Sequence, residues 1–214
     1  MKSVLIIGMG RLGRHLAKKM QQLGNDVMIV DNRPELIDNL SDEFTDSACC
    51  DCTNEAVIRS LGVDNFDICF VTIGEDFQSS LVITSHLKKH GARMIVAKTN
   101  QDIQAELLRI IGADEVVYPE VDVAEKLAVR YNADNIFDFV PLTAEYSIYE
   151  LPVQPAWVGK TLVELDVRRK YHVNIIAVKN GSSLNPNLGG DYKFRTDDHI
   201  IVIGKSNEVF KLVK

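Results

Sequence analysis

Residues 2–13 read KSVLIIGMGRLG, an apolar run that ends in a glycine-rich turn. The glycines at positions 8, 10 and 13 have the spacing G-x-G-x-x-G, and Leu12, Leu16 and Met20 recur at helical spacing behind them. In such a turn the first glycine permits a sharp bend, the second lets a pyrophosphate approach the backbone, and the third lets the helix pack closely on the sheet. The segment therefore predicts the first strand, turn and helix of a dinucleotide-binding fold.

An acidic residue stands where this fold places one. Asp31 ends the next predicted strand, residues 26–31, in a position to accept hydrogen bonds from an adenosine ribose. A carboxylate there disfavours the 2′-phosphate of NADP, although Arg33 weakens that inference. Arg11 lies inside the turn, where a guanidinium is suited to phosphates beyond those held by backbone N–H groups. The alternatives are a solvated Arg11 on the first helical turn and, for the whole motif, a turn that binds nothing.

Strands and helices continue to alternate as far as residue 118. Further strands are predicted at 47–50, 67–73, 93–98 and 115–118, with helices at 34–40, 54–61, 76–90 and 103–111. Nearly continuous apolar strands between helices predict a parallel sheet covered on both faces, the doubly wound Rossmann-type α/β fold. Asp51 and the turn 72–76 would then lie at the carboxyl edge of the sheet, where ligands of this fold bind. Asp76 has a second explanation, as the cap of the helix that follows.

The pattern changes after Pro119. A helix is predicted at 121–132, an aromatic and apolar connector at 135–141, and short strands at 146–153, 173–178 and 199–203. We place the domain boundary after Pro141, which gives a Rossmann domain with a crossover helix at 1–141 and a small α+β domain at 142–214. The connector carries Ile136, Phe137 and Phe139, so we interpret it either as an interdomain or intersubunit packing element or as a local part of the core.

Charge, the length of the apolar runs and the cysteine spacing argue against several classes of function. The formal net charge of −6 argues against a nucleic-acid partner, because affinity for a phosphate backbone comes from many Lys and Arg. The apolar runs 4–7 and 68–73 are far shorter than the roughly 20 residues of a membrane-spanning helix, and we expect no signal peptide and a cytoplasmic location. The cysteines crowd together, and without a second C-x-x-C or nearby histidines we expect buried, reduced thiols rather than a metal or redox site. They are Cys49, Cys50, Cys52 and Cys69.

Motifs of catalysis are missing from the sequence. It contains no G-x-S-x-G elbow, no H-E-x-x-H and no P-loop Gly-Lys-Ser/Thr. The sequence predicts a cofactor-binding domain without the substrate domain that a typical dehydrogenase adds to it, which suggests a sensor rather than an enzyme. The alternatives are a small NAD-dependent oxidoreductase, for which no general acid is found, and a redox-sensing transcriptional regulator, for which no basic DNA-binding helix is found.

The order and spacing of these motifs resemble the regulatory subunits of TrkA/KtrA type, in which a regulator-of-potassium-conductance (RCK) domain precedes a TrkA-C domain. The likeness covers essentially the whole chain. It rests on GMGRLG at 8–13, Asp31, TIG at 72–74, VAK at 96–98, IGAD at 111–114, YPE at 118–120, YSI at 146–148, VRRKY at 167–171 and DHIIVIG at 198–204. The chain departs from the family at 196–198, where a Gly-Asp turn is usual, and in its triple-cysteine third strand.

The resemblance implies a Rossmann domain that binds ATP, ADP or NAD(H), with Arg11 near the terminal phosphate of ATP and Asp31 on the ribose. It also implies that Glu120 helps to bind a divalent cation, Mg or Ca, at a dimer interface. In some relatives the C-terminal domain binds cyclic di-AMP, and Arg168 and Asn174 match that pocket. The complete predicted nucleotide site consists of Gly8, Met9, Gly10, Arg11, Leu12, Gly13, Asp31, Asn32, Arg33, Asp51, Cys52, Thr72, Ile73, Gly74 and Lys98.

The same resemblance implies partners. Homodimers would assemble into an octameric ring beneath a membrane-embedded potassium-translocating subunit of the TrkH/KtrB type, at the inner face of the cell membrane. A ligand can shift such a ring only if it binds two conformations with different affinities. Our hypothesis is that ATP, through its third phosphate and Arg11, favours the ring shape that opens the channel, whereas ADP favours another.

Overall fold

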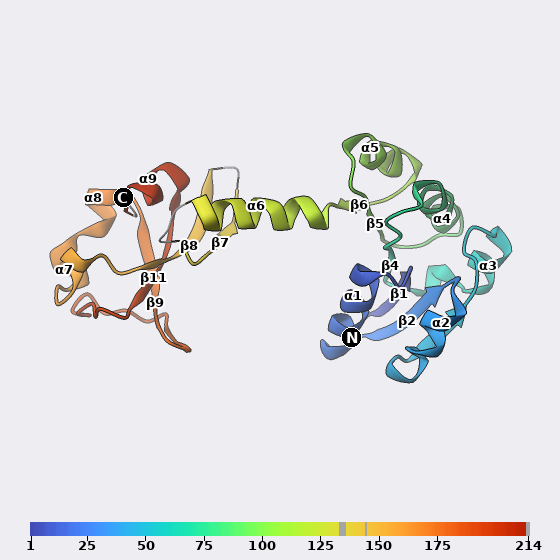
Figure 1. Ribbon diagram of the computed structural model, residues 1–214, viewed down its shortest axis with the longest axis horizontal. Helices are drawn as coiled ribbons and strands as arrows, with labels where there is room; N and C mark the ends of the chain where they lie inside the picture. Colours follow the sequence, from blue (N-terminus) through green and yellow to red (C-terminus); the bar gives the residue numbers. More distant parts are fainter. Residues whose placement is uncertain (133–135, 144, 213–214) are drawn as a thin grey trace. The chain divides into compact units, whose positions relative to one another are not determined.

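The computed structural model describes residues 1–132, 136–143 and 145–212. The chain folds into two compact units, Met1–Val121 and Asp122–Lys214 (Figure 1). Each unit has its own sheet and its own core, and each is described separately below.

The first unit contains a parallel sheet in the order β3-β2-β1-β4-β5-β6. The strands are β1 Ser3–Ile7, β2 Asp26–Asp31, β3 Asp46–Cys49, β4 Ile68–Val71, β5 Ile95–Lys98 and β6 Glu115–Val117. The strand order reverses between β1 and β4, which confirms the predicted doubly wound Rossmann-type fold. In this topology a crevice forms outside the carboxyl ends of the two strands at the reversal.

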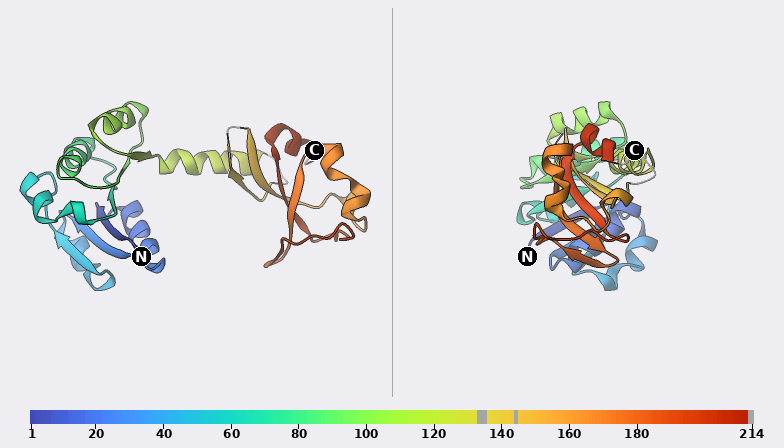
Figure 2. Two further views of the ribbon diagram at one scale, coloured as in Figure 1. Left: turned by 180° about the vertical axis from the view of Figure 1, so that it is seen from behind. Right: turned by 90° about the vertical axis from the view of Figure 1, so that its left-hand side faces the viewer.

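Helices cover both faces of this sheet (Figure 2). They are α1 Arg11–Gln22, α2 Pro34–Asp38, α3 Glu55–Ser60, α4 Phe77–Lys89 and α5 Asp102–Ile111, with short 3₁₀ turns at Ser41–Glu43 and Val63–Asn65. Val4 and Ile6 of β1 pack with Ala17 of α1 on one face. Leu5 and Ile7 join the cluster formed with α3, α4 and α5 on the other face. Because β1 is buried on both sides, its sequence is a continuous apolar run.

The second unit contains an antiparallel sheet in the order β10-β9-β11-β8-β7. The strands are β7 Asp138–Pro141, β8 Tyr146–Pro152, β9 Asn174–Asn180, β10 Ser183–Asn185 and β11 His199–Lys205. The remaining helices are α6 Pro119–Asn132, which spans the division between the units, α7 Leu162–Leu165, α8 Val167–Tyr171 and α9 Ser206–Leu212, with a 3₁₀ turn at Pro155–Trp157. No helix within the described ranges is both long and apolar enough to cross a membrane.

The predicted connector 135–141 is in part a strand. Residues 138–141 form β7, which pairs with β8, and the sequence did not predict this strand because the pairing is set by a neighbour further along the chain. Ile136 is buried in the core of the second unit and Phe139 packs against that core, so both are a local part of the core, which is one of the two interpretations of the connector. Phe137 stays exposed, and Asn135 lies outside the described residues.

The connector also explains where the units divide. The predicted boundary followed Pro141, whereas the structural division falls after Val121. Val129 of α6 and Ile136 pack into the core of the second unit, so the chain joins that unit well before Pro141.

Candidate functional site

A cavity of about 870 Å³ opens at the carboxyl edge of the parallel sheet, within the size range of ligand pockets. The predicted site residues that line it are Gly8, Gly10, Arg11, Leu12, Asp31, Asn32, Arg33, Asp51, Cys52, Thr72, Ile73, Gly74, Lys98 and Glu120. The wall is completed by Ile7, His15, Cys50, Thr53, Glu75, Asp76, Ser79, Ile83, Asn100 and Pro119. The structure thus brings together residues that the sequence spreads over more than half of the chain.

Two predicted site residues, Met9 and Gly13, lie behind the wall. The Met9 side chain is fully buried in the cluster beneath α1 and α2. A Cβ atom on Gly13 would overlap the carbonyl oxygen of Gly8 and lie 2.7 Å from the Thr72 hydroxyl. Both residues therefore shape the turn rather than line its open side.

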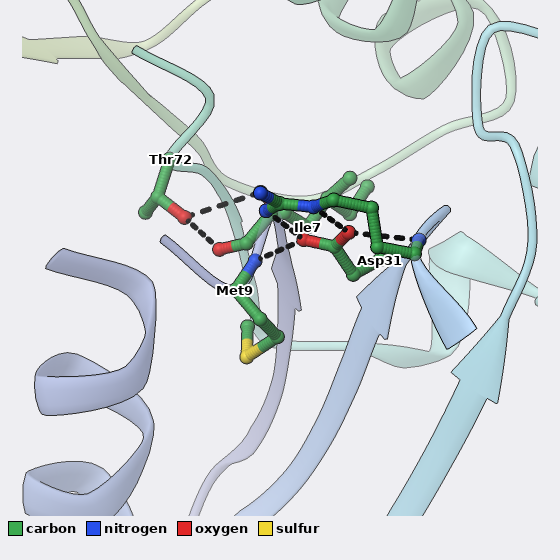
Figure 3. A network of polar contacts seen from close by, with 6 residues as sticks. Ile7, Met9, Asp31 and Thr72 are labelled. Carbon is green, nitrogen blue, oxygen red and sulfur yellow. Dashed lines mark hydrogen bonds and ion pairs between the residues drawn. The ribbon is translucent and has the colours of Figure 1, made fainter. Parts of the chain in front are cut away.

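The glycine turn is closed on one side and open on the other. Gly8 has φ +101°, a conformation that side chains rarely adopt. The Thr72 hydroxyl lies 2.6 Å from the Gly8 carbonyl oxygen and 3.2 Å from that of Ile7, and so ties the end of β4 to the end of β1 (Figure 3). Among the residues that the structure describes, nothing lies within 4 Å of the position that a Cβ on Gly10 would take. Gly10 is thus the point where a ligand can come closest to the backbone.

Helix α1 begins at this open point without a cap. Its N-cap, Gly10, offers no side chain, and the first turn contains no acidic residue. The first hydrogen bond of the helix runs from the Arg14 N–H to the Gly10 carbonyl, so the earlier N–H groups have no partner within the helix. Free N–H groups and the helix dipole favour an anion at this position. Arg11, the first helical residue, adds a positive charge to the pocket wall.

The neighbouring helix α4 begins differently. The Asp76 carboxylate accepts hydrogen bonds from the backbone N–H and the hydroxyl of Ser79, at 3.0 and 2.6 Å. These bonds hold the pKa of Asp76 below its usual value. Asp76 lines the pocket, but its contacts support the role of a helix cap.

Asp31 is the most enclosed polar group of the pocket. Its Oδ2 accepts the Met9 N–H at 2.6 Å (Figure 3), and Oδ1 accepts the Arg33 backbone N–H at 3.0 Å. The Arg33 guanidinium adds two bonds, from Nε to Oδ1 at 2.8 Å and from Nη2 to Oδ2 at 2.9 Å. Burial alone would raise the pKa of Asp31, but the bonds from Arg33 and Met9 outweigh it and lower the pKa. The carboxylate is therefore held in its charged form.

Lys98 and Glu120, which also line the pocket, form an ion pair. Lys98 Nζ donates to Glu120 Oε1 at 2.7 Å, and the Lys98 side chain is 17% exposed. This hydrogen bond lowers the pKa of Glu120. Within the part of the chain that the structure describes, no group of three or more His, Cys, Asp or Glu is placed to hold a metal ion. Glu120 alone would need ligands from elsewhere to bind a divalent cation.

The cysteines near the pocket are free thiols in different environments. Cys52 and Cys69 are buried, and burial raises the pKa of each thiol to about 12. Cys50 is half-buried, and burial also raises its pKa. Cys49 is exposed, which corrects our expectation that all four are buried: as the last residue of edge strand β3, it has a side chain that faces solvent.

In the second unit, Arg168 lies on α8 and Asn174 begins β9, and both are exposed. Residues 196–198 form a turn that Asp198 closes. Here the sequence departs from the Gly-Asp turn that is usual in the family that it resembles. The buried carboxylate of Asp198 accepts the Arg195 N–H and the Tyr192 hydroxyl, each at 2.8 Å, and Asn180 Nδ2 at 3.0 Å. A side chain thus supplies the contacts that hold the turn.

Some pocket residues had recognisable signals that the prediction missed. His15 lies one helical turn after Arg11, and its Nδ1 is 2.8 Å from the Arg11 carbonyl oxygen. Asn100 follows the end of β5 by two residues, so the rule that selected Asp51 would also have selected it. Ser79 and Ile83 on α4 have no local signal, because the fold alone brings them to the pocket.

Comparisons with known proteins agree with this architecture. Residues 4–119 match the TrkA-N domain and residues 147–214 match the TrkA-C domain. The chain is 32% identical over 213 residues to the Ktr system potassium uptake protein C of Bacillus subtilis (strain 168), covering 100% of this chain and 96% of that protein. It is 29% identical over 208 residues to the Ktr system potassium uptake protein A of the same strain, covering 97% of this chain and 94% of that protein.

A solved structure of the GsuK channel bound to NAD shares the fold, with a TM-score of 0.70 and 19% identity. The match covers 100% of this chain but only 39% of that channel. The TrkA-N match alone spans more than half of the chain, and the resemblance inferred from the motifs is confirmed. The protein belongs to the TrkA/KtrA family, whose members join a TrkA-N domain of the RCK type to a TrkA-C domain.

Proposed function

We propose that this chain is the nucleotide-sensing regulatory subunit of a potassium uptake system. An adenine nucleotide binds in the pocket at the carboxyl edge of the first unit, and its occupancy controls a membrane-embedded potassium-translocating subunit of the TrkH/KtrB type. One observation carries the proposal: the open glycine turn and the uncapped start of α1 face the same pocket as the buried Asp31. Because two relatives are named potassium uptake proteins, we propose potassium uptake as the process that the nucleotide regulates.

Different residues of the pocket bind different parts of the nucleotide. Backbone N–H groups at Gly10 and the first turn of α1 take the pyrophosphate, because they are unpaired within the helix and lie at its positive end. Asp31 takes the ribose hydroxyls. Arg11 takes a phosphate beyond the pyrophosphate, which gives ATP a contact that ADP lacks.

The charges of the pocket favour a sensor over an enzyme. Asp31 is held in its charged form by its hydrogen bonds, Asp76 caps α4, and Glu120 is paired with Lys98. The Cys52 thiol, with a pKa of about 12, is unreactive as a nucleophile near neutral pH. The competing proposal, a small NAD-dependent oxidoreductase, would have to take its proton donor from another residue of the pocket, such as His15.

Assembly into a homodimer and then an octameric ring is part of the proposal. Ile103, Leu107 and Ile110 on α5 are 60%, 38% and 79% exposed, and their spacing places them on one face of the helix. An apolar stripe of this kind is typical of a surface that another protein covers. In such a dimer, Glu120 residues of two subunits would together provide the carboxylates for Mg²⁺ or Ca²⁺. Cyclic di-AMP at Arg168 and Asn174 remains a separate proposal for the second unit.

The test is calorimetric titration of wild type with ATP, ADP, NAD and NADH, repeated on Arg11→Ala. Arg14→Ala is the matched control, because it removes the same group from the same helix but does not line the pocket. We expect Arg11→Ala to lose the preference for ATP over ADP and Arg14→Ala to keep it. Absence of binding by wild type contradicts the proposal. Turnover of nicotinamide across a substrate panel would instead support the oxidoreductase.

A further inference from the structure

The carboxylate of Asp31 already has all the hydrogen-bond donors that it can accept. Each oxygen receives two, one from a backbone N–H and one from the Arg33 guanidinium, at 2.6 to 3.0 Å. A carboxylate offers about four lone-pair sites. A ribose hydroxyl can therefore reach Asp31 only if one of these donors leaves.

The two kinds of donor differ in how easily they can leave. The backbone N–H groups of Met9 and Arg33 are fixed by the glycine turn and by the start of α2. The Arg33 side chain is 52% exposed and lines the pocket, whereas the Asp31 side chain is 4% exposed. The guanidinium is thus the exchangeable donor, and it presents two N–H groups to the carboxylate as two adjacent ribose hydroxyls would.

The guanidinium also has other negative charges within reach. Its pKa is raised first by its hydrogen bond to Asp31 and further by the charges of Asp31, Glu35 and Glu75. Glu75 lies on the wall of the same pocket. A guanidinium that leaves Asp31 therefore remains in a negative environment, which makes the exchange feasible.

We propose that Arg33 determines nucleotide affinity by competing with the ribose for Asp31. This inference rests on the proposed function and adds to it a residue that opposes binding, although its positive charge lines an anion pocket. The usual expectation for such an arginine is that its removal weakens binding. Competition reverses the sign: removal of the guanidinium frees two acceptor sites and strengthens binding.

The test compares the affinities of wild type, Arg33→Met and Arg33→Lys for ADP and for 2′,3′-dideoxy-ADP, which lacks both hydroxyls. If the guanidinium leaves Asp31 in about one molecule in ten, Arg33→Met binds ADP about tenfold more tightly than wild type. The gain is absent with dideoxy-ADP. Arg33→Lys keeps the charge but loses the paired N–H groups, so it shows a smaller gain for ADP. Arg109→Met, which removes an exposed charge from α5, leaves both affinities unchanged.

The outcomes separate this inference from the proposed function. If wild type and all variants fail to bind any adenine nucleotide, the competition and the proposed function are both wrong. If wild type binds ADP and Arg33→Met binds it equally or more weakly, competition is wrong and the nucleotide site stands. The same holds if Arg33→Met gains equally for dideoxy-ADP. If Arg33→Met does not fold, Arg33→Lys decides, since competition requires it to bind ADP more tightly than wild type.

Discussion

The Met9 N–H donates to Oδ2 of Asp31 at 2.6 Å, so the acid at the end of β2 holds the glycine turn after β1 in place. The turn and the acid are therefore one structural unit, although 22 positions separate them in the sequence. A residue chosen by sequence as a ligand contact is also part of the fold. Substitution of Asp31 should change stability as well as binding.

Asp31→Asn should lower the free energy of unfolding at pH 7 by about 1–3 kcal/mol, because buried donors lose a charged acceptor. The folded-state pKa of Asp31 is lowered, so its stabilisation is complete above the unfolded pKa, near 4, and is lost as the pH falls through the folded pKa. Urea unfolding between pH 7 and pH 3 should show a steeper loss for wild type than for Asp31→Asn. Asp26→Asn, exposed at the start of the same strand, is the control, and equal slopes for wild type and Asp31→Asn would contradict the prediction.

Two glycines of one motif should respond in opposite ways to alanine. Gly13→Ala places a methyl group against the Gly8 carbonyl and the Thr72 hydroxyl, and should cost about 1–3 kcal/mol of stability. The methyl group of Gly10→Ala has no neighbour within 4 Å in the described part of the chain, and the φ of −68° suits any residue. Stability should therefore hold while the methyl group obstructs the phosphates. Thermal unfolding and ADP titration of both variants test this. A Gly10→Ala protein that binds ADP like wild type would show that phosphates do not approach there.

The sequence predicted the first unit well because its signals are local. The apolar runs, the glycine turn and the acid at the end of the second strand predicted the bounds of β2, Asp26–Asp31, to the residue. They also predicted most of the residues that line the pocket. The second unit was harder, because β7 and β10 are short strands whose existence depends on pairing with β8 and β9. The contact between Arg33 and Asp31 was also beyond the sequence, since only the folded turn shows that both carboxylate oxygens are used.

Asp198 should be the acid that stabilises the second unit. Asp198→Ala removes a buried acceptor of three hydrogen bonds and should cost about 2–3 kcal/mol. Burial would raise the pKa of Asp198, but bonds from Asn180, Arg195 and Tyr192 lower it, so its contribution is lost in acid as the pH falls below about 4. The near-ultraviolet circular dichroism of Trp157, the single tryptophan of the sequence, would report this unit during urea unfolding. Asp197→Ala, exposed beside it, is the control.

Thiol labelling should distinguish the cysteines by burial. Cys49 is exposed and should react with iodoacetamide first, whereas Cys52 and Cys69, buried and with pKa values near 12, should react only after unfolding. Tandem mass spectrometry of the peptides after timed labelling resolves the sites. Cys49→Ser should remove the fast phase. Rapid modification of Cys69 in the folded protein would mean that β4 opens far more readily than its burial implies.

Glu120→Gln should abolish any stabilisation of the protein by Ca²⁺ or Mg²⁺ if two copies of this residue hold the ion. In a single chain Lys98 donates to Glu120 at 2.7 Å, so an arriving cation has to displace an ammonium group that already compensates the carboxylate. Lys98→Met should therefore strengthen divalent binding, while Glu120→Gln should remove it. Thermal unfolding with and without CaCl₂ measures both effects, and analytical ultracentrifugation shows whether the ion promotes dimers. Glu115→Gln, exposed at the start of β6, controls for the loss of one negative charge. Equal stabilisation of wild type and Glu120→Gln by CaCl₂ would place the ion elsewhere.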